Sequence, residues 1–382
     1  MPDRPIPYGR QTITDADIEA VNRVLQSDFL TQGPAVAEFE EAFASYIGSN
    51  YAVAVANGTA ALHLCAMALN VEPGQKVITT PITFAASANC VRYCGGEVVF
   101  ADVDDNALLD INKVRALLEA SPKGTYAGII PVAFTGRPVD LRAYRQLADE
   151  YGCWLIEDAC HAPGGGINNA FQCGDGSLAE LAIFSFHPVK HIACGEGGMI
   201  TTNSRELYDR LQLLRTHGIT KSPDLLHENH GGWYYEMHEL GYNYRLSDMH
   251  CALGSSQLQR AADGLKRRQA IAARYDEAFA NLPLHVVGQP EADINHAYHL
   301  YVIRTANRKG LYDYLRQHSI YAQVHYIPLH LLPYYKEQGW KPGDLPNAEA
   351  YYNECLSLPM FPGMTDDEQD YVIQTISRFY EQ

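Results

Sequence analysis

One lysine has surroundings that suit an amine nucleophile. Lys190 follows an apolar segment typical of a buried strand and precedes a glycine cluster at 195–198, in the run Phe184-Ser185-Phe186-His187-Pro188-Val189-Lys190-His191. Apolar and aromatic neighbours disfavour the charged form of an amine, so they lower its pKa and make it reactive toward carbonyl groups. The alternative is an ordinary surface lysine in a loop. Ser185, near the end of the expected strand, has a hydroxyl that can face a phosphate.

A pair of acids ends a second apolar run, Leu155-Ile156-Glu157-Asp158-Ala159-Cys160-His161. Ligands of an open α/β sheet lie at the carboxyl ends of its strands, which is where Asp158 is expected. A buried carboxylate needs a cation or hydrogen-bond donors, and a protonated pyridine nitrogen is one such cation. A helix N-cap or a core ion pair is the commoner role of a lone aspartate here.

A third run has the pattern of a phosphate-binding turn: Asn57-Gly58-Thr59-Ala60-Ala61-Leu62. A strand ends, a glycine turns the chain and a helix begins, so unpaired N–H groups and the positive end of the helix dipole are presented together. Thr59 adds a hydroxyl. A tight turn with close helix packing is the alternative. A fourth segment, 240–247, contains Asn243 and Arg245, and capping of the next helix is its simplest interpretation.

Two other chemistries have less support. His187 and His191 have the i, i+4 spacing of two metal ligands, but Pro188 between them is unfavourable inside a helix. The sequence has no H-E-x-x-H and no paired C-x-x-C. It also has no G-x-G-x-x-G after an expected strand, as dinucleotide binding requires. We therefore expect neither a metal site nor a dinucleotide site.

These runs are separated by alternating strand and helix patterns. Strands are expected at 51–56, 76–80, 97–103, 128–132, 153–157, 181–186 and 199–202. Helices are expected at 60–69, 85–93, 112–119, 141–151 and 205–214. Several strands are nearly continuous apolar runs, as strands buried on both faces should be. The alternation predicts an α/β fold with a mostly parallel central sheet and helices on both faces.

The other segments suggest two domains. An extended arm at 1–13 precedes a helix capped by Thr14 and a second helix at 36–47. A long loop is expected at 218–245 and a helical stretch at 246–281. The C-terminal part has strand patterns at 299–303 and 323–326 and helix patterns at 311–317 and 365–380. We predict a large domain over 1–255 and a smaller C-terminal α/β domain over 256–382.

Composition excludes several classes of partner. The chain has 382 residues, with 29 Lys and Arg against 45 Asp and Glu, and a formal net charge of −16, which argues against nucleic acid or an anionic membrane as the main partner. No run of about 18 apolar residues suggests a membrane span, and residues 1–5 lack the apolar core of a signal peptide. The nine cysteines are scattered, as in proteins of a reducing compartment. We expect a cytoplasmic protein.

The order of the motifs along the chain resembles that of fold-type I pyridoxal-phosphate enzymes, which have the fold of aspartate aminotransferase. The motifs are a phosphate-type turn, an aspartate that ends a strand and Ser-x-x-x-x-Lys. Over nearly its whole length the chain resembles the DegT/DnrJ/EryC1/StrS family of sugar aminotransferases. The motifs that carry this resemblance are Leu30-Thr31-Gln32-Gly33-Pro34, Asn57-Gly58-Thr59-Ala60-Ala61-Leu62, Glu157-Asp158-Ala159, Phe184-Ser185-Phe186-His187-Pro188-Val189-Lys190 and Gly241-Tyr242-Asn243-Tyr244-Arg245-Leu246.

The resemblance implies a role for each matching residue. Lys190 bonds covalently to the aldehyde of pyridoxal phosphate and later moves a proton, and Asp158 keeps the pyridine nitrogen protonated. Phe84 stacks on the ring and His161 flanks it. Thr59, the backbone of Ala60 and Ser185 bind the phosphate, together with Asn243 of a neighbouring subunit, so that a homodimer shares its sites. The sugar nucleotide is contacted by Tyr8, Leu30, Thr31, Gln32, Gly33, His325, Tyr326, Ile327 and Pro328.

Within the family, the resemblance is greatest to the transaminases of pseudaminic acid biosynthesis. It implies transfer of the amino group of L-glutamate to C4 of a UDP-4-keto-6-deoxy-N-acetylhexosamine, UDP-4-keto-6-deoxy-L-AltNAc, with pyridoxamine phosphate as the aminated cofactor. Another UDP- or dTDP-keto sugar, aminated at C4 or C3, is an alternative. So is a sugar dehydratase of the same fold, although such relatives replace the lysine by histidine. A non-catalytic binding protein is the remote alternative, since the lysine, aspartate and phosphate turn are all intact. One departure is Cys194, where many relatives have threonines.

Overall fold

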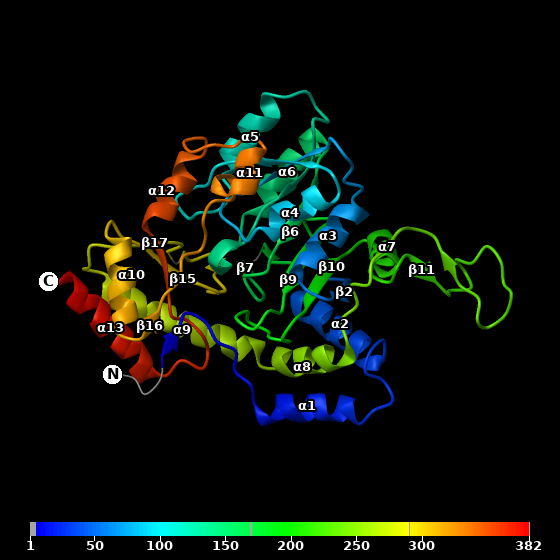
Figure 1. Cartoon of the computed structure of the whole chain (residues 1–382), viewed down its shortest axis with the longest axis horizontal. Coiled ribbons are helices and arrows are strands. Elements are labelled where there is room, and N and C mark those ends of the chain that lie inside the picture. The colour runs from blue at the N-terminus through cyan, green and yellow to red at the C-terminus, as the bar shows by residue number, and fades with distance from the viewer. Residues whose placement is uncertain (1–4, 169, 290, 382) are drawn as a thin grey trace.

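A seven-stranded sheet lies at the centre of the computed structural model, which describes residues 5–168, 170–289 and 291–381 (Figure 1). In spatial order its strands are β2 (Tyr51–Val55), β10 (Gly198–Thr202), β9 (Leu181–Ser185), β6 (Trp154–Asp158), β5 (Tyr126–Ile130), β3 (Lys76–Thr79) and β4 (Glu97–Phe100). Only β10 is antiparallel to its neighbours, and every other neighbouring pair is parallel. The predicted α/β fold with a mostly parallel sheet is confirmed.

Helices cover both faces of this sheet because side chains alternate along each strand. Val53 and Val55 pack on the face covered by α3 (Gly58–Ala68), α4 (Ala86–Tyr93) and α7 (Arg205–Arg215). Ala52 and Ala54 pack on the opposite face, which is covered by α2 (Pro34–Ile47) and α8 (Asp248–Leu258). Further along that face lie α5 (Ile111–Glu119) and α6 (Leu141–Tyr151). Outside α8 lies α1 (Asp15–Leu25), capped as predicted by Thr14.

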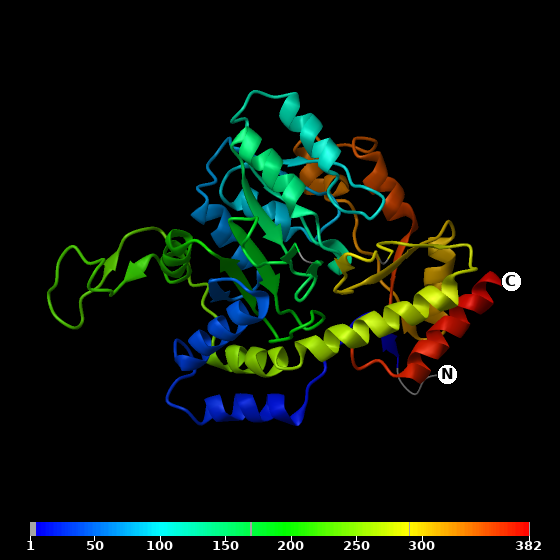
Figure 2. The ribbon, with the colours of Figure 1, turned by 180° about the vertical axis from the view of Figure 1, so that it is seen from behind.

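The C-terminal part has a core of its own around a three-stranded sheet (Figure 2). This sheet contains β13 (His285–Val286), β15 (Tyr301–Arg304) and β17 (Cys355–Leu358). The helices that pack in this core are α9 (Ala261–Phe279), α10 (Arg308–Gln317) and α13 (Asp366–Tyr380). Two further helices, α11 (Pro333–Glu337) and α12 (Pro346–Glu354), pack against the large part instead. A small sheet of β7 (Gly166–Ile167), β8 (Phe171–Gln172) and β14 (Ile294–Asn295) joins this part to the large one.

The N-terminal arm belongs in space with the C-terminal part. β1 (Ile6–Pro7) pairs in parallel with β16 (Ile320–Tyr321), and Ile6 is fully buried in the C-terminal core. The first four residues of the predicted arm lie outside the described residues. The two-domain division at 255 remains a prediction, and residue 255 lies inside α8.

The expected helical stretch at 246–281 is confirmed and consists of two helices. α8 ends at Leu258 and α9 begins at Ala261. Around this break, the side chains of Gln257 and Arg260 both donate hydrogen bonds to Asp17 of α1, at 3.1 and 2.9 Å. These contacts hold the end of α8 on α1, while α9 continues into the C-terminal part.

The expected strand at 323–326 is also wrong. Only Gln323 makes a bridge, to Ser357 of β17, and the next N–H, of Val324, donates to the side chain of Gln323 instead of to a strand. The sequence pattern is extended, but the segment then turns away toward the central part, where the N–H of Leu329 donates to the carbonyl of Pro81 at 2.9 Å.

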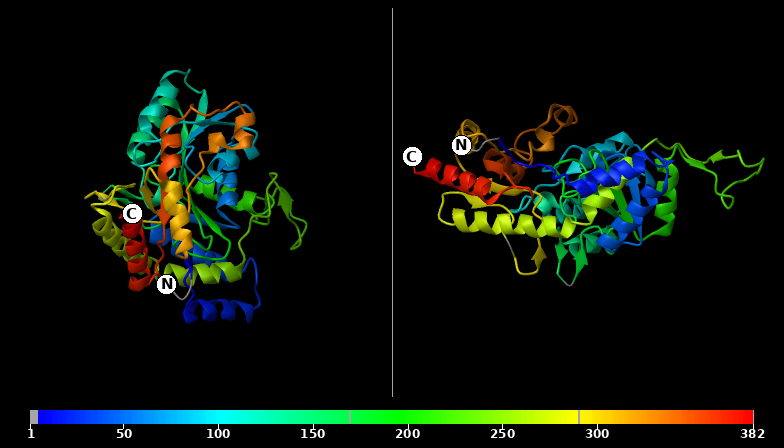
Figure 3. Two further views of the ribbon diagram at one scale, coloured as in Figure 1. Left: turned by 60° about the vertical axis from the view of Figure 1, so that its left-hand side comes forward. Right: turned by 90° about the horizontal axis from the view of Figure 1, so that it is seen from below.

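The predicted long loop contains an antiparallel hairpin, β11 (Ile219–Thr220) with β12 (Glu236–Met237). Residues 218–240, which we call the hairpin arm, project from the body of the molecule (Figure 3). Trp233 and Leu240 on the arm are 75% and 76% exposed. Both apolar side chains are therefore open to contact with another molecule.

Two further observations concern sequence predictions. The nine cysteines are free thiols, and seven of them are buried. Cys194 is among the buried ones, and burial raises the pKa of its thiol, which makes it a poor nucleophile. No helix in the described ranges combines the length and the apolar character that a membrane span needs.

Candidate functional site

A cavity of about 450 Å³ lies where β6 and β9 end, beside the start of α3. Carboxyl ends of parallel strands are where this class of fold binds its ligands. The cavity is lined by nine of the residues predicted from the sequence: Tyr8, Thr59, Phe84, Asp158, His161, Ser185, Lys190, His325 and Tyr326. They come from the N-terminal arm, four βα units and the C-terminal part, so the cavity exists only in the folded chain.

Lys190 occupies the wall of the cavity just beyond β9. The chain turns after Ser185, and the turn is closed by a hydrogen bond of 2.8 Å from the N–H of Lys190 to the carbonyl of His187. Burial lowers the pKa of the Lys190 amine below its ordinary value. Within the described residues no ion pair involves Lys190. Its amine is therefore placed and activated as a nucleophile requires.

Asp158 is a buried carboxylate that faces the cavity. Its Oδ2 accepts a hydrogen bond of 2.7 Å from the hydroxyl of Ser87, and its Oδ1 accepts one of 3.2 Å from the N–H of Cys160. The hydroxyls of Ser87 and Thr83 are 2.8 Å apart, which extends the network. In the part of the chain that the structure describes, Asp158 forms no ion pair. A buried carboxylate without a cation fits a protonated ring nitrogen of a bound molecule.

The neighbouring acid, Glu157, has a different environment because it points to the opposite face of β6. Its Oε2 accepts a hydrogen bond of 2.8 Å from the N–H of Gly174, while Oε1 is buried without a hydrogen-bond partner among the described residues. Burial raises the pKa of Glu157 to about 7. Of the two acids, only Asp158 can act in the cavity.

The start of α3 forms an anion cradle beside Ser185. Asn57 caps the helix, and its side chain accepts a hydrogen bond of 2.8 Å from the N–H of Ala60. The predicted contact of the Ala60 backbone with a phosphate remains a prediction. A phosphate could accept the N–H of Ala60 only by displacing the side chain of Asn57. A Cβ at Gly58 would lie 3.0 Å from Cβ of Ser185, so glycine lets the turn approach β9 closely. Thr59 and Ser185 contribute their hydroxyls to the cradle.

Aromatic rings form the remaining walls. Phe84 is 63% exposed although it lines the cavity, so its ring is available to stack on a planar ligand. The rings of Tyr8 and His325 are 5.1 Å apart, and Nδ1 of His325 lies 2.8 Å from Oγ of Ser357. The N-terminal arm and the C-terminal part thus close the cavity together.

Sequence reasoning missed several polar residues of the cavity, among them Ser87 and His299. Ser87 lies one helical turn after Thr83, and nothing in its spacing links it to Asp158. His299 lies 4.2 Å from His161 between ring centroids, and burial holds the pKa of both imidazoles well below its usual range. The side chain of Arg268 fixes this segment by donating to the carbonyls of Tyr298 and His299, each at 3.2 Å.

Eight predicted residues do not line the cavity. One is Ala60 at the start of α3, and four belong to the loop at 30–33. There the N–H of Gly33 donates to Asp248 at 2.9 Å, the N–H of Asp248 donates to the carbonyl of Leu30 at 3.1 Å, and Thr31 bridges to Ser247. The remaining three are Asn243, which is exposed and bridges to Thr216, Ile327, which is 46% exposed, and Pro328, which is buried.

Gln32 and Gly33 line a separate cavity together with Arg215 and Arg245. The predicted contact of the 30–33 loop with the sugar nucleotide remains a prediction, and so does the contact of Asn243 with the phosphate of a neighbouring subunit.

The i, i+4 histidines do not form a metal site with each other. His187 lines the Lys190 cavity, whereas Nε2 of His191 lies 2.8 Å from the carbonyl oxygen of Ala297. In the described ranges neither belongs to a group of side chains with metal-ligand spacing.

Comparison with known proteins adds evidence of another kind. The model of the DegT/DnrJ/EryC1/StrS aminotransferase family matches residues 11–377. Spore coat polysaccharide biosynthesis protein SpsC of Bacillus subtilis (strain 168) is 39% identical over 379 residues, which are 97% of this chain and 96% of SpsC.

Solved structures agree with this match. Helicobacter pylori PseC, described as an aminotransferase involved in the biosynthesis of pseudoaminic acid, has a TM-score of 0.90 and 27% identity, covering 99% of this chain and 100% of PseC. Spr1654 of Streptococcus pneumoniae, solved in PLP and PMP forms, has in its PLP form a TM-score of 0.89 and 29% identity, covering 99% of each chain.

Proposed function

The chain belongs to the DegT/DnrJ/EryC1/StrS aminotransferase family, and from this premise we propose that it transfers the amino group of L-glutamate to C4 of UDP-4-keto-6-deoxy-L-AltNAc, in pseudaminic acid biosynthesis. Membership of the family makes the protein a sugar aminotransferase that uses pyridoxal phosphate. The observation that carries the proposal is one cavity with a desolvated lysine, a buried carboxylate that lacks a cation, and an anion cradle.

The cavity residues fit the cofactor group by group. Pyridoxal phosphate, when bound, supplies a carbonyl carbon for the amino group and an electron-accepting ring. Lys190 would hold it through Nζ, and Asp158 would hold a proton at its ring nitrogen. Thr59 and Ser185 would hold its phosphate, and Phe84 would cover a face of its ring. The hydrogen bond from Ser87 keeps the carboxylate of Asp158 oriented for this task.

Lys190 has a second task. Burial lowers the pKa of the Lys190 amine, so a larger fraction of it is uncharged at neutral pH than for an exposed lysine. Once the cofactor no longer occupies Nζ, this uncharged amine is free to accept a proton. We propose that Nζ would take the proton from the amino-bearing carbon of L-glutamate and pass it to the cofactor carbon that receives the amino group. In the second half of the reaction it would carry a proton in the reverse direction, from that carbon to C4 of the sugar. The neutral imidazoles of His161 and His299 line the same cavity without adding positive charge beside this amine.

The choice of sugar rests on likeness. PseC supports a pseudaminic acid precursor, and Tyr8, His325 and Tyr326 form an aromatic and polar wall suited to a sugar. SpsC supports the second candidate, another UDP- or dTDP-keto sugar aminated at C4 or C3, because it is more identical to this chain and is described as a spore coat polysaccharide biosynthesis protein.

We also propose a homodimer with shared sites. The exposed apolar side chains of the hairpin arm support a partner surface, and the exposed position of Asn243 supports a contact across the interface.

A substrate panel tests the proposal. The enzyme loaded with cofactor is mixed with L-glutamate and, separately, with UDP-4-keto-6-deoxy-L-AltNAc, a dTDP-4-keto sugar and a dTDP-3-keto sugar. We expect the highest kcat/KM with the first sugar, equimolar 2-oxoglutarate, and a product whose new amino group is at C4 by NMR. A higher kcat/KM with a dTDP-sugar would overturn the substrate while leaving the activity intact. Loss of a sugar hydroxyl without 2-oxoglutarate would show a dehydratase instead.

A further inference from the structure

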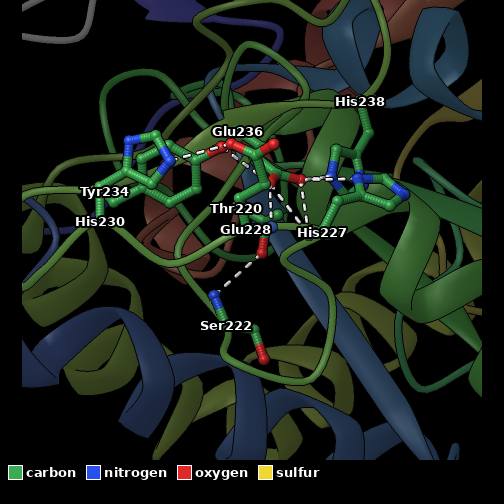
Figure 4. A network of polar contacts seen from close by, with 8 residues as sticks. All are labelled: Thr220, Ser222, His227, Glu228, His230, Tyr234, Glu236 and His238. Atoms are coloured by element: carbon green, nitrogen blue, oxygen red, sulfur yellow. Dashed lines mark hydrogen bonds and ion pairs between the residues drawn. The ribbon is translucent and has the colours of Figure 1, made fainter.

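The hairpin arm carries a group of metal-ligand side chains outside the Lys190 cavity. We propose that His227, Glu236 and His238 form a binding site for a divalent transition-metal ion of the zinc class. Their ligand atoms all lie within 4.8 Å of one another, and Figure 4 shows the two imidazoles converging on the carboxylate. No sequence motif marks this group, because the loop between His227 and β12 has to fold back before the three side chains meet.

The geometry is close to that of a bound ion. Nδ1 of His227 and Nε2 of His238 each lie 2.8 Å from Oε2 of Glu236, and the two ring centroids are 5.0 Å apart. A tetrahedral zinc ion with bonds of about 2.0–2.1 Å separates its ligand atoms by about 3.3 Å. The two pairs that share Oε2 therefore need to open by only about half an ångström, and the two imidazole nitrogens already lie within 4.8 Å of each other.

Glu236 is held in place before any ion binds. Its Oε1 accepts hydrogen bonds of 3.0 Å from the N–H of Glu228 and 3.0 Å from the hydroxyl of Tyr234, and the N–H of His227 adds one of 2.9 Å (Figure 4). Outer contacts of this kind orient metal ligands and strengthen binding. The carboxylate side chain is 12% exposed, whereas His227 is 81% exposed, so an ion can enter from the side of His227.

The donor set selects the class of metal. Two imidazole nitrogens and one carboxylate oxygen suit zinc, nickel and copper, whereas calcium and magnesium require mainly oxygen ligands. Three protein ligands leave the fourth position for water. Since His227 lies in the loop and Glu236 and His238 lie on or beside β12, an ion would tie the loop of the arm to its returning strand.

Titration of the untagged holoenzyme tests this site. After treatment with a chelator and dialysis, the wild type is titrated with Zn²⁺ by calorimetry and with Co²⁺ by its visible spectrum. We expect one strong site per chain and tetrahedral Co²⁺ bands. His227→Ala and His238→Ala should each weaken binding at least about tenfold. His230→Ala is the matched control, because His230 lies on the same arm and pairs with Glu228 at 2.9 Å but is not a ligand.

Other results would overturn the proposal. Equal affinity of the wild type and the double variant His227→Ala/His238→Ala would show that the cluster is only a set of hydrogen bonds. Equal loss in His230→Ala would show binding by arm histidines in general, and equal binding of Mg²⁺ and Zn²⁺ would refute the metal class. Zn²⁺ bound by the cofactor or by cysteines is the same in the wild type and in the variants, so it does not affect the difference between them. An unchanged circular dichroism spectrum shows that the variants are folded.

Discussion

The hydroxyl of Ser87 donates a hydrogen bond of 2.7 Å to Oδ2 of Asp158. This contact joins two βα units, because Ser87 lies on α4 and Asp158 ends β6. It is also the shorter of the two hydrogen bonds that orient the carboxylate, since the other oxygen accepts the N–H of Cys160 at 3.2 Å.

Ser87→Ala should therefore weaken the binding of pyridoxal phosphate. A hydrogen bond to a charged group contributes about 1.5–3 kcal/mol, so we expect the dissociation constant of the cofactor to rise about 10- to 100-fold. The measurement is a titration of the apoenzyme with the cofactor, followed by absorbance. Ser27→Ala, at an exposed helix end, is the control. An unchanged constant would show that Asp158 does not need this donor.

Lys190→Ala should abolish turnover and the covalent attachment of the cofactor, because Lys190 is the desolvated amine of the cavity. Borohydride reduction of the wild type followed by peptide mass spectrometry should place the cofactor on Lys190 alone. Lys221→Ala, which removes an exposed lysine, should label as the wild type does. A label on another lysine would refute the assignment.

Gly58→Ala should reduce cofactor affinity by about tenfold, because the new Cβ would lie 3.0 Å from Cβ of Ser185 and push the anion cradle away from β9. The same titration measures it. Gly232→Ala is a matched control, since a Cβ there meets no atom within 4 Å. Equal affinity in both variants would mean that the turn adapts without cost.

Glu157→Gln should change the dependence of stability on pH. Burial raises the pKa of Glu157 from its ordinary 4.5 to about 7, so the folded chain prefers the protonated acid. Its contribution to the free energy of unfolding is fully present below pH 4.5 and is lost as the pH rises through 7. The total loss is about 3 kcal/mol. The amide cannot ionise, so the variant should keep its thermal midpoint between pH 5 and pH 8 better than the wild type.

The control for this experiment is Glu97→Gln, which removes an exposed carboxylate at the start of β4. Its thermal midpoint should fall with pH as that of the wild type does. If the thermal midpoint of Glu157→Gln falls as much as that of the wild type when the pH is raised, Glu157 is not the group responsible.

Mixing two variants should reveal shared sites. If Asn243 acts in the neighbouring subunit, a heterodimer of Lys190→Ala and Asn243→Ala has one site with both defects and one with none. Random exchange would then restore about a quarter of the wild-type activity. If Asn243 acts in its own subunit, every site keeps a defect and mixing restores nothing. Turnover measured after mixing and refolding distinguishes the two outcomes.

Local pattern was enough to predict the elements that hold the cofactor site. Lys190, Asp158, Ser185 and Thr59 all follow directly from strand ends or helix starts, and parallel topology brings such positions to one edge of the sheet. For this reason, residues predicted from separate motifs line the same cavity.

Contacts between distant segments could not be predicted in the same way. Ser87 meets Asp158 across 71 residues, and Asp248 binds Gly33 across 215. The break between α8 and α9 has no glycine or proline of its own, and the residues around it contact Asp17, which is far away in the chain. The hairpin within 218–245 has two-residue strands, too short for a periodic signal.

The pairing of β1 with β16 has a consequence for how the protein is made. Ile6 is buried against Ile320, a residue synthesised more than 300 positions later. On the ribosome, the beginning of the chain must therefore wait until nearly all of the protein has emerged before it finds its place. The large sheet, whose strands all precede residue 203, can assemble earlier, so the step that brings Tyr8 to the cavity follows the synthesis of β16.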